Sequence, residues 1–362
     1  MKPFVQVKPD KKTLKRIEKK VRQVLLSNNY VLGKHVAEFE SKFAKFIGTS
    51  YAVGVGSGTD ALRLGLRVLG IGSGDKVLTS AFTSPFTILS IVEEEAIPVF
   101  VDIDRETWTI DPQEIEKQID GKTRAIVPVH IYGNPCHMPQ IVKLAKKSGL
   151  KIIEDACQAH GARIEDEMLG SWGELAAFSF YPTKNLGGVG DGGMITTNHR
   201  QLATTLTYLR NGGQTRRFYH SLRGVNSRLD ELQAAILAVK MSLLNQQNRK
   251  RRWLAKRYQD GLADLPLAFQ KTIPGGYHVY HQFVVRTGKR QALKKFLHTK
   301  GIMTDVHYPL PADSQPIFAA YKISKLRVTQ QISREILSLP IYPDLSIREQ
   351  DQIIKNIRKF FG

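Results

Sequence analysis

The chain has 362 residues, more than one ordinary domain needs, so we expect two domains or one large α/β domain. With 42% hydrophobic and 24% charged residues the composition is that of a globular protein, and its apolar runs are too short to cross a bilayer. The basic residues behind the formal net charge of +20 are spread along the chain, and their one denser stretch, at residues 249–252, lacks interleaved aromatic residues. This favours a basic-surfaced enzyme with anionic small-molecule ligands over a protein that binds nucleic acid or a membrane.

About the first half of the chain alternates between helical and extended patterns. An amphipathic helix over residues 14–25, behind a possible Asp10 cap, and a second over 36–46 come first. The alternating segments that follow are strands at 51–55, 76–79, 97–101, 125–129, 151–154, 175–180 and 193–197, and helices at 59–69, 85–95, 112–119 and 139–147. This order predicts a mostly parallel sheet covered by helices on both faces, which binds ligands at the carboxyl ends of its strands.

The remaining residues predict a smaller α/β unit. We expect one long helix over 228–257, a strand at 281–285, a helix at 291–298, a strand at 302–306 and a terminal helix at 347–360. The boundary is expected near residue 245, which gives a large domain of residues 1–245 and a small domain of residues 246–362.

The cysteine content indicates a reducing compartment. Only Cys136 and Cys157 occur, which excludes a disulfide scaffold, and the first residues lack the apolar run of a secretory signal. The low cysteine content and the missing signal together predict a cytoplasmic location. No CxxC or HExxH spacing is present, so we expect no metal site.

A glycine-containing turn between a predicted strand and helix is the first candidate site. Gly58 and Thr59 open the helix, where backbone N–H groups and a hydroxyl can hold a phosphate. The segment Gly56 to Ala61 also matches the GxGxxA dinucleotide fingerprint, but the second strand ends in Thr79-Ser80, where that fingerprint requires an acidic residue. A tight turn without a ligand is the remaining alternative.

Two further candidates follow later strands. Asp155 closes a predicted strand and could face a ligand, or could cap a helix. Lys184 lies just beyond another strand, before five glycines within residues 187–193, and could be an activated amine or an exposed lysine on a mobile loop.

Together these candidates indicate pyridoxal phosphate chemistry. This cofactor needs an amine for a Schiff base, a carboxylate to keep its pyridine nitrogen protonated and a cradle for its phosphate. Lys184 would be the amine and afterwards the general base, Asp155 the carboxylate, and the turn at Gly58 the cradle.

The sequence also resembles the DegT/StrS-type sugar aminotransferases, which have the fold-type I aminotransferase architecture. The resemblance covers nearly the whole chain and rests on motifs that are specific in combination. These motifs are Ser57-Gly58-Thr59-Asp60-Ala61-Leu62, Pro98-Val99-Phe100-Val101-Asp102, Glu154-Asp155-Ala156, Ser179-Phe180 with Lys184, Gly190-Asp191-Gly192-Gly193, Asn226 to Gln233, His307-Tyr308-Pro309 and Ser338-Leu339-Pro340.

The resemblance implies further site residues and a homodimer. It places Gln158 near the ring hydroxyl of the cofactor and Ser179 at the phosphate. It also implies that Asn226 reaches the phosphate of the neighbouring subunit, so that the active sites are shared. Arg228 is a candidate for binding a carboxylate or the anionic nucleotide, or alternatively forms a surface ion pair with Asp230 or Glu231.

One position departs from the family pattern. An aromatic residue usually stacks on the pyridine ring, and Ser84 stands where that residue would align. Phe86 is the first choice to take over the stacking and Phe82 the second, although both could be core residues.

The resemblance implies transfer of an amino group from L-glutamate to a keto-sugar attached to a nucleoside diphosphate. The form of the motif at Asn226 favours dTDP- or UDP-linked 3-keto sugars over 4-keto sugars. A branch of the family that performs dehydration has histidine in place of the lysine, and Lys184 argues against it. A nicotinamide-dependent oxidoreductase and a regulatory binding protein on the same fold stay open as alternatives.

Overall fold

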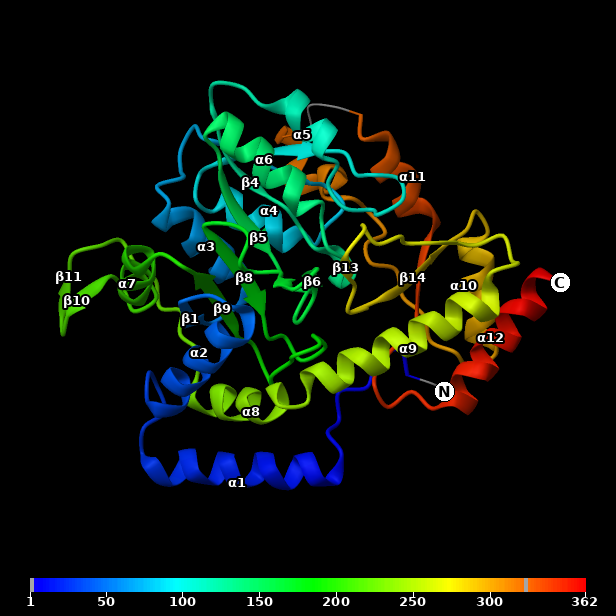
Figure 1. Ribbon diagram of the computed structural model, residues 1–362, viewed down its shortest axis with the longest axis horizontal. Helices are drawn as coiled ribbons and strands as arrows, with labels where there is room; N and C mark the ends of the chain where they lie inside the picture. Colours follow the sequence, from blue (N-terminus) through cyan, green and yellow to red (C-terminus); the bar gives the residue numbers. More distant parts are fainter. Residues whose placement is uncertain (1–2, 322–324) are drawn as a thin grey trace.

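A seven-stranded sheet forms the centre of the computed structural model, which describes residues 3–321 and 325–362 (Figure 1). The strand order is β1-β9-β8-β5-β4-β2-β3, and only β9 runs antiparallel to its neighbours. The strands are β1 (Tyr51–Val55), β2 (Lys76–Ser80), β3 (Ile97–Val101), β4 (Thr123–Val127), β5 (Lys151–Asp155), β8 (Leu175–Ser179) and β9 (Gly193–Thr197). The predicted mostly parallel α/β sheet is therefore confirmed.

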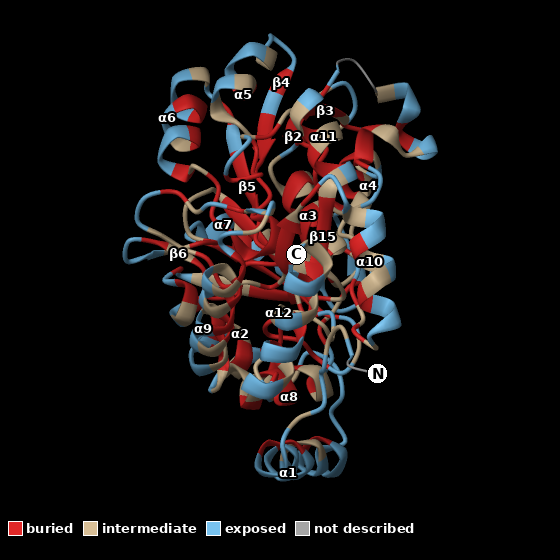
Figure 2. Ribbon diagram, turned by 90° about the vertical axis from the view of Figure 1, so that its right-hand side faces the viewer, coloured by how far each residue is buried: buried red, intermediate tan, exposed pale blue. Residues whose placement is uncertain are grey.

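Helices cover both faces of this sheet, because successive side chains of a strand point to opposite faces. In β5, Ile152 packs with one layer and Ile153 with the other. The first layer contains α2 (Lys34–Ile47), α5 (Pro112–Gln118), α6 (Met138–Ser148) and α8 (Glu231–Met241), and the second contains α3 (Gly58–Val68), α4 (Pro85–Val92) and α7 (Arg200–Leu209). Figure 2 shows the buried strands between exposed helical surfaces.

The amino-terminal helix α1 (Lys11–Ser27) lies along α8, outside the layered core (Figure 1). Asp10 caps it as predicted, since its Oδ1 accepts the N–H groups of Lys12 and Thr13 at 2.8 and 2.9 Å. Ile17 and Val24 are buried and attach the helix to the body.

The carboxyl-terminal part differs from the prediction in two places. The single helix expected over 228–257 is two helices, α8 and α9 (Leu244–Leu262). The Ser242 hydroxyl donates to the Val239 carbonyl at 2.8 Å at the end of α8, a side-chain bond that competes with continued helix. The strand expected at 302–306 is not formed, because Ile302 and Asp305 are only isolated bridge residues there, and Asp305 pairs with Ser338.

A small antiparallel sheet organises this part. It consists of β12 (Ala268–Phe269), β14 (Phe283–Arg286) and β15 (Ile336–Leu339), and β15 follows α11 (Arg327–Glu335). Helices α9, α10 (Arg290–Thr299) and α12 (Ile347–Phe361) enclose its apolar core, at the right of Figure 1.

Short elements complete the described chain. The strands are β6 (Arg163–Ile164), β7 (Glu167–Met168), β10 (Gln214–Arg216), β11 (Tyr219–His220) and β13 (Gly276–Tyr277), and the 3₁₀ helices are Ile131–Gly133, Ala312–Ser314 and Pro316–Tyr321. The β10–β11 hairpin projects at the left edge of Figure 1. Among the described residues, no helix has the length and apolar character needed to cross a membrane.

An apolar seam joins the small sheet to the central one. Phe82 and Trp108, beyond the ends of β2 and β3, form one buried cluster with Val284, Ile332 and Ile336. The small sheet therefore packs directly beside the carboxyl edge of the large sheet.

Candidate active site

The turn between β1 and α3 lies against the ends of β5 and β8. Ser57 caps α3 by accepting the Asp60 N–H at 3.0 Å, and Gly58 is the first helical residue. A Cβ on Gly58 would lie 2.8 Å from Cys157 Sγ and 2.8 Å from Ser179 Cβ, closer than van der Waals contact permits. Only glycine fits here, and Thr59 follows it on the first turn of the helix.

Asp155 is the last residue of β5 and is 5% exposed. Its Oδ1 accepts the Cys157 N–H at 3.2 Å, and its Oδ2 accepts the Thr87 hydroxyl at 2.8 Å. The alternative role as a helix cap is wrong, because residues 156–199 contain no α-helix.

Lys184 lies in the loop after β8 and is partly buried, so the alternative of an exposed lysine is wrong. Burial lowers the pKa of Lys184, and the neighbouring Cys157 and Asp155 oppose that shift. Within the described chain its ammonium group makes no hydrogen bond or salt bridge. It is therefore an unengaged amine that gives up its proton more readily than an exposed lysine.

Three histidines lie within electrostatic reach of this lysine. Burial lowers the pKa of His160 to about 3 and that of His281 well below its usual value, and the Lys184 charge adds to both shifts. The pKa of His307 is also lowered, mainly by burial. Burial and Asp155 raise the pKa of the Cys157 thiol well above its ordinary value. The His160 imidazole is therefore neutral at neutral pH.

Gln158 connects the site to the small sheet's side of the molecule. Its Oε1 accepts the Tyr132 N–H at 2.7 Å, and its Nε2 donates to the Tyr308 hydroxyl at 3.4 Å. Tyr308 also hydrogen bonds with Ser84, and burial raises its pKa to about 12. No role for Tyr308 was predicted from the sequence, although it belongs to the family motif His307-Tyr308-Pro309.

The aromatic candidates for ring stacking occupy different environments. Phe86, on α4, is 62% exposed, whereas Phe82 is 2% exposed and packs edge-on against Tyr132 with ring centroids 6.0 Å apart. Phe82 is thus a core residue. The third ring near Ser84 belongs to Tyr308.

The segment that contains Asn226 is attached to the glycine turn. Ser227 donates to Asp60 Oδ2 at 2.7 Å and accepts the Gly56 N–H at 2.8 Å. Asn226 itself is exposed. Of the predicted phosphate contacts, Gly58, Thr59 and Ser179 therefore lie together, and Asn226 lies on the outside of the same region.

Arg228 does not form the ion pair that was weighed as its alternative role. Its Nη1 donates to Asn211 Oδ1 at 2.8 Å. The Glu231 carboxylate instead accepts backbone N–H groups at the start of α2, from Gly33, His35 and Val36.

These residues fit the cofactor that the sequence predicts. The glycine-only turn leaves helix N–H groups beside the ends of β5 and β8, where an anionic phosphate is favoured. The unengaged amine and the buried carboxylate lie close enough to influence each other's charge. One lysine, one acid and one anion-holding turn thus meet at a single edge of the sheet.

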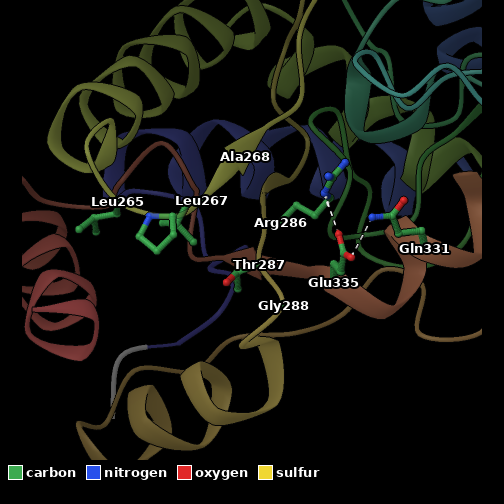
Figure 3. A pocket seen from close by; sticks show the side chains of 9 residues that line it. Leu265, Leu267, Ala268, Arg286, Thr287, Gly288, Gln331 and Glu335 are labelled. Atoms are coloured by element: carbon green, nitrogen blue, oxygen red, sulfur yellow. Dashed lines mark hydrogen bonds and ion pairs between the residues drawn. The ribbon is translucent and has the colours of Figure 1, made fainter.

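A separate surface hollow lies in the small sheet's region (Figure 3). It measures about 330 Å³ and contains an Arg286–Glu335 salt bridge of 2.8 Å, and Gln331 donates to the same carboxylate at 3.2 Å. Its charges are already paired, and none of the predicted site residues lines it.

Comparisons with known proteins agree with this geometry. The model of the DegT/DnrJ/EryC1/StrS aminotransferase family matches residues 11–358. The chain is 41% identical to a dTDP-3-amino-3,4,6-trideoxy-alpha-D-glucose transaminase of Streptomyces venezuelae (99% of this chain, 96% of the relative). It is equally similar, at 41%, to a pleiotropic regulatory protein of Geobacillus stearothermophilus (99% and 96%). The crystal structure of S. venezuelae DesV in complex with a ketimine intermediate superposes with a TM-score of 0.97 at 41% identity (99% and 98%).

Proposed function

The chain belongs to the DegT/DnrJ/EryC1/StrS aminotransferase family, whose enzymes depend on pyridoxal phosphate, and we propose that it moves an amino group from L-glutamate to a keto-sugar linked to a nucleoside diphosphate. The observation that carries the proposal is the meeting of Lys184, Asp155 and the Gly58 turn at one sheet edge. Family membership removes the nicotinamide-dependent alternative.

Each residue of the site has a proposed task. Lys184 would hold the cofactor through its amine, and its Nζ would accept and return a proton as general base, a role that its lowered pKa supports. Asp155 holds a proton on the ring nitrogen, while Gln158 contacts the ring hydroxyl. The cofactor, when bound, supplies an electron sink.

The phosphate is assigned to the β1–α3 turn. We propose that Gly58, Thr59 and Ser179 hold it through N–H and hydroxyl donors. Phe86 remains the proposed residue that stacks on the cofactor ring. The alternative is the Tyr308 ring, which lies beside Ser84, and substitution of Phe86 would distinguish the two.

We propose a dTDP- or UDP-linked 3-keto sugar as the amino acceptor. Support comes from the form of the motif at Asn226 and from the name of the Streptomyces relative, a transaminase that makes a 3-amino sugar. The basic surface suits a diphosphate. Arg228 is the candidate residue for binding either the negatively charged diphosphate or the carboxylate of glutamate. The same chemistry on a 4-keto sugar is the alternative.

The proposed assembly is a homodimer with shared active sites. Asn226 is exposed in the single chain, so it is free to reach the phosphate bound by a second copy. Apolar side chains near it are also exposed, namely Phe218, Tyr219 and Leu222 of the projecting hairpin region. Burying them against a second copy would remove an apolar patch from water.

We further propose a domain boundary near residue 245 and a cytoplasmic location. The interruption between α8 and α9 supports a boundary at this point in the chain. The two cysteines are unpaired, as is usual in reducing compartments.

The test uses the covalent bond to Lys184. Borohydride reduction of the holoenzyme should fix the cofactor on the peptide that contains Lys184, located by mass spectrometry. Lys184→Ala should lose this label and amino transfer to a panel of nucleotide-linked 3-keto and 4-keto sugars, whereas Lys146→Ala, an exposed lysine on α6, should retain both. Transfer that survives in Lys184→Ala would refute the assignment, and preference for a 4-keto sugar would refute the proposed acceptor.

A further inference from the structure

Two buried hydroxyl groups connect the start of α4 to the Asp155 carboxylate. Thr87 donates to Asp155 Oδ2 at 2.8 Å, and the hydroxyl oxygens of Thr83 and Thr87 are 3.0 Å apart. Thr83 is 1% and Thr87 2% exposed. A threonine hydroxyl has one proton, and Thr87 gives it to the carboxylate, so Thr83 must be the donor to Thr87. The chain of donation therefore runs from Thr83 through Thr87 to Asp155.

The backbone fixes Thr87 in this position. Its N–H donates to the Ser84 carbonyl at 3.1 Å, and its own carbonyl accepts the Ser90 hydroxyl at 2.7 Å. Pro85 at the first turn of α4 further limits the local backbone. The hydroxyl thus approaches the carboxylate from a rigid element, which makes it suited to orient that group.

We infer that Thr87 is a positioning residue for the cofactor-facing carboxylate, with Thr83 as its support. The inference rests on the proposed function, in which Asp155 pairs with the ring nitrogen. With Cys157 N–H on Oδ1 and the Thr87 hydroxyl on Oδ2, both oxygens are held and the carboxylate plane is fixed. Donated hydrogen bonds also favour the charged form of a buried carboxylate, the form that attracts a protonated ring nitrogen.

A purely structural hydroxyl in the same region provides the matched control. Thr79 on β2 is fully buried, and its hydroxyl donates to the Val127 carbonyl at 2.8 Å. Thr79→Val and Thr87→Val each remove a buried hydroxyl that donates a 2.8 Å hydrogen bond, with the same change in shape. They differ in that only Thr87 contacts Asp155 and accepts from Thr83, so Thr87→Val also leaves the Thr83 hydroxyl without this acceptor.

The experiment measures the dissociation constant of pyridoxal phosphate by titrating apoenzyme, together with the visible absorption of the bound cofactor as a function of pH. Thr87→Val should raise the dissociation constant about tenfold or more, because it removes a hydrogen bond to a charged group. It should also shift the pH dependence of the absorption. Thr87→Ser, which keeps the hydroxyl, should restore both, and Thr79→Val should leave both unchanged while lowering the stability of the apoenzyme.

Asp155→Asn separates failure of this inference from failure of the proposed function. If Asp155→Asn alters affinity and spectrum while Thr87→Val alters neither, the positioning role of Thr87 is wrong. If Asp155→Asn changes neither, the assignment of Asp155 itself fails. If Thr87→Val does not fold, Thr83→Val replaces it in the experiment. Thr83→Val should raise the dissociation constant of pyridoxal phosphate about threefold. An unchanged dissociation constant in that variant overturns the inference.

Discussion

Gly58 provides the sharpest test of the proposed phosphate cradle. In Gly58→Ala the new Cβ would lie 2.8 Å from Cys157 Sγ and from Ser179 Cβ, and 3.3 Å from Ser179 Cα. Carbon atoms in contact are about 3.5–4.0 Å apart, so the end of β8 must move by several tenths of an ångström. Such overpacking costs about 1–3 kcal/mol. Alanine's better helix propensity returns about 1 kcal/mol, which leaves an expected loss of up to about 2 kcal/mol in unfolding free energy.

The control lies in the same helix. A Cβ on Gly65 would meet Ile153 and Leu175 at 3.6 Å, an ordinary contact, so Gly65→Ala should be neutral or stabilise the protein by up to about 1 kcal/mol. Urea unfolding of both apoenzymes gives the stability difference, and cofactor titration should show weaker binding for Gly58→Ala alone.

A double-mutant cycle identifies the contact responsible. Cys157→Ala removes the Cys157 Sγ atom, one of the two atoms that the new Cβ would approach to 2.8 Å. The loss of unfolding free energy in Gly58→Ala/Cys157→Ala should therefore be smaller than the sum of the two single losses, by at least about 0.5 kcal/mol. If Gly58→Ala is as stable and binds the cofactor as tightly as Gly65→Ala, the steric argument is wrong. Strict additivity would show that Cys157 is not the limiting neighbour.

Two further outcomes are expected. His160 has a folded pKa of about 3 against an unfolded value of 6.5, so unfolding takes up a proton between these values and stability is lost as pH falls below 6.5. Urea unfolding at pH 7.5 and pH 5 measures how much unfolding free energy is lost on acidification. His160→Phe should reduce that loss by about 2 kcal/mol, whereas His298→Phe, at an exposed position, should not. Equal pH profiles for His160→Phe and the wild type would exclude His160 as the source of the pH dependence. If active sites are shared, mixing inactive Lys184→Ala and Asn226→Ala subunits should restore about a quarter of wild-type activity, since about half the dimers are mixed and each has one intact site. No recovery after verified subunit exchange would contradict shared sites.

The order of strands and helices around the central sheet was predictable because each element has a strong local signal. Five-residue apolar runs such as 97–101 end at polar residues and alternate with helical periods. The errors occur where the local period does not record the outcome. Helix α8 ends at Met241 although the apolar period continues, and β15, not residues 302–306, pairs with β14.

The site shows the same division between local and long-range information. Lys184 and Asp155 were found because each follows a strand, and the carboxyl ends of parallel strands meet at one edge. Thr87 and Tyr308 were not found, because their roles depend on contacts with residues 68 and 150 positions away. No periodicity in the sequence records such contacts.

The choice between two adjacent carboxylates shows how strand register can extend the sequence argument. Ile153 packs with the helical layer that contains α3, and Ile152 packs with the opposite layer. Side chains alternate along a strand, so Asp155 shares the side of Ile153, where Gly58 begins α3, and Glu154 points away. Glu154 accordingly accepts hydrogen bonds from three backbone N–H groups in the turn before β8. It also accepts one from the imidazole of His130, in the loop after β4. The alternation of side chains along a single strand therefore decides which of two neighbouring acids lies on the side of the Gly58 turn and which one supports the fold.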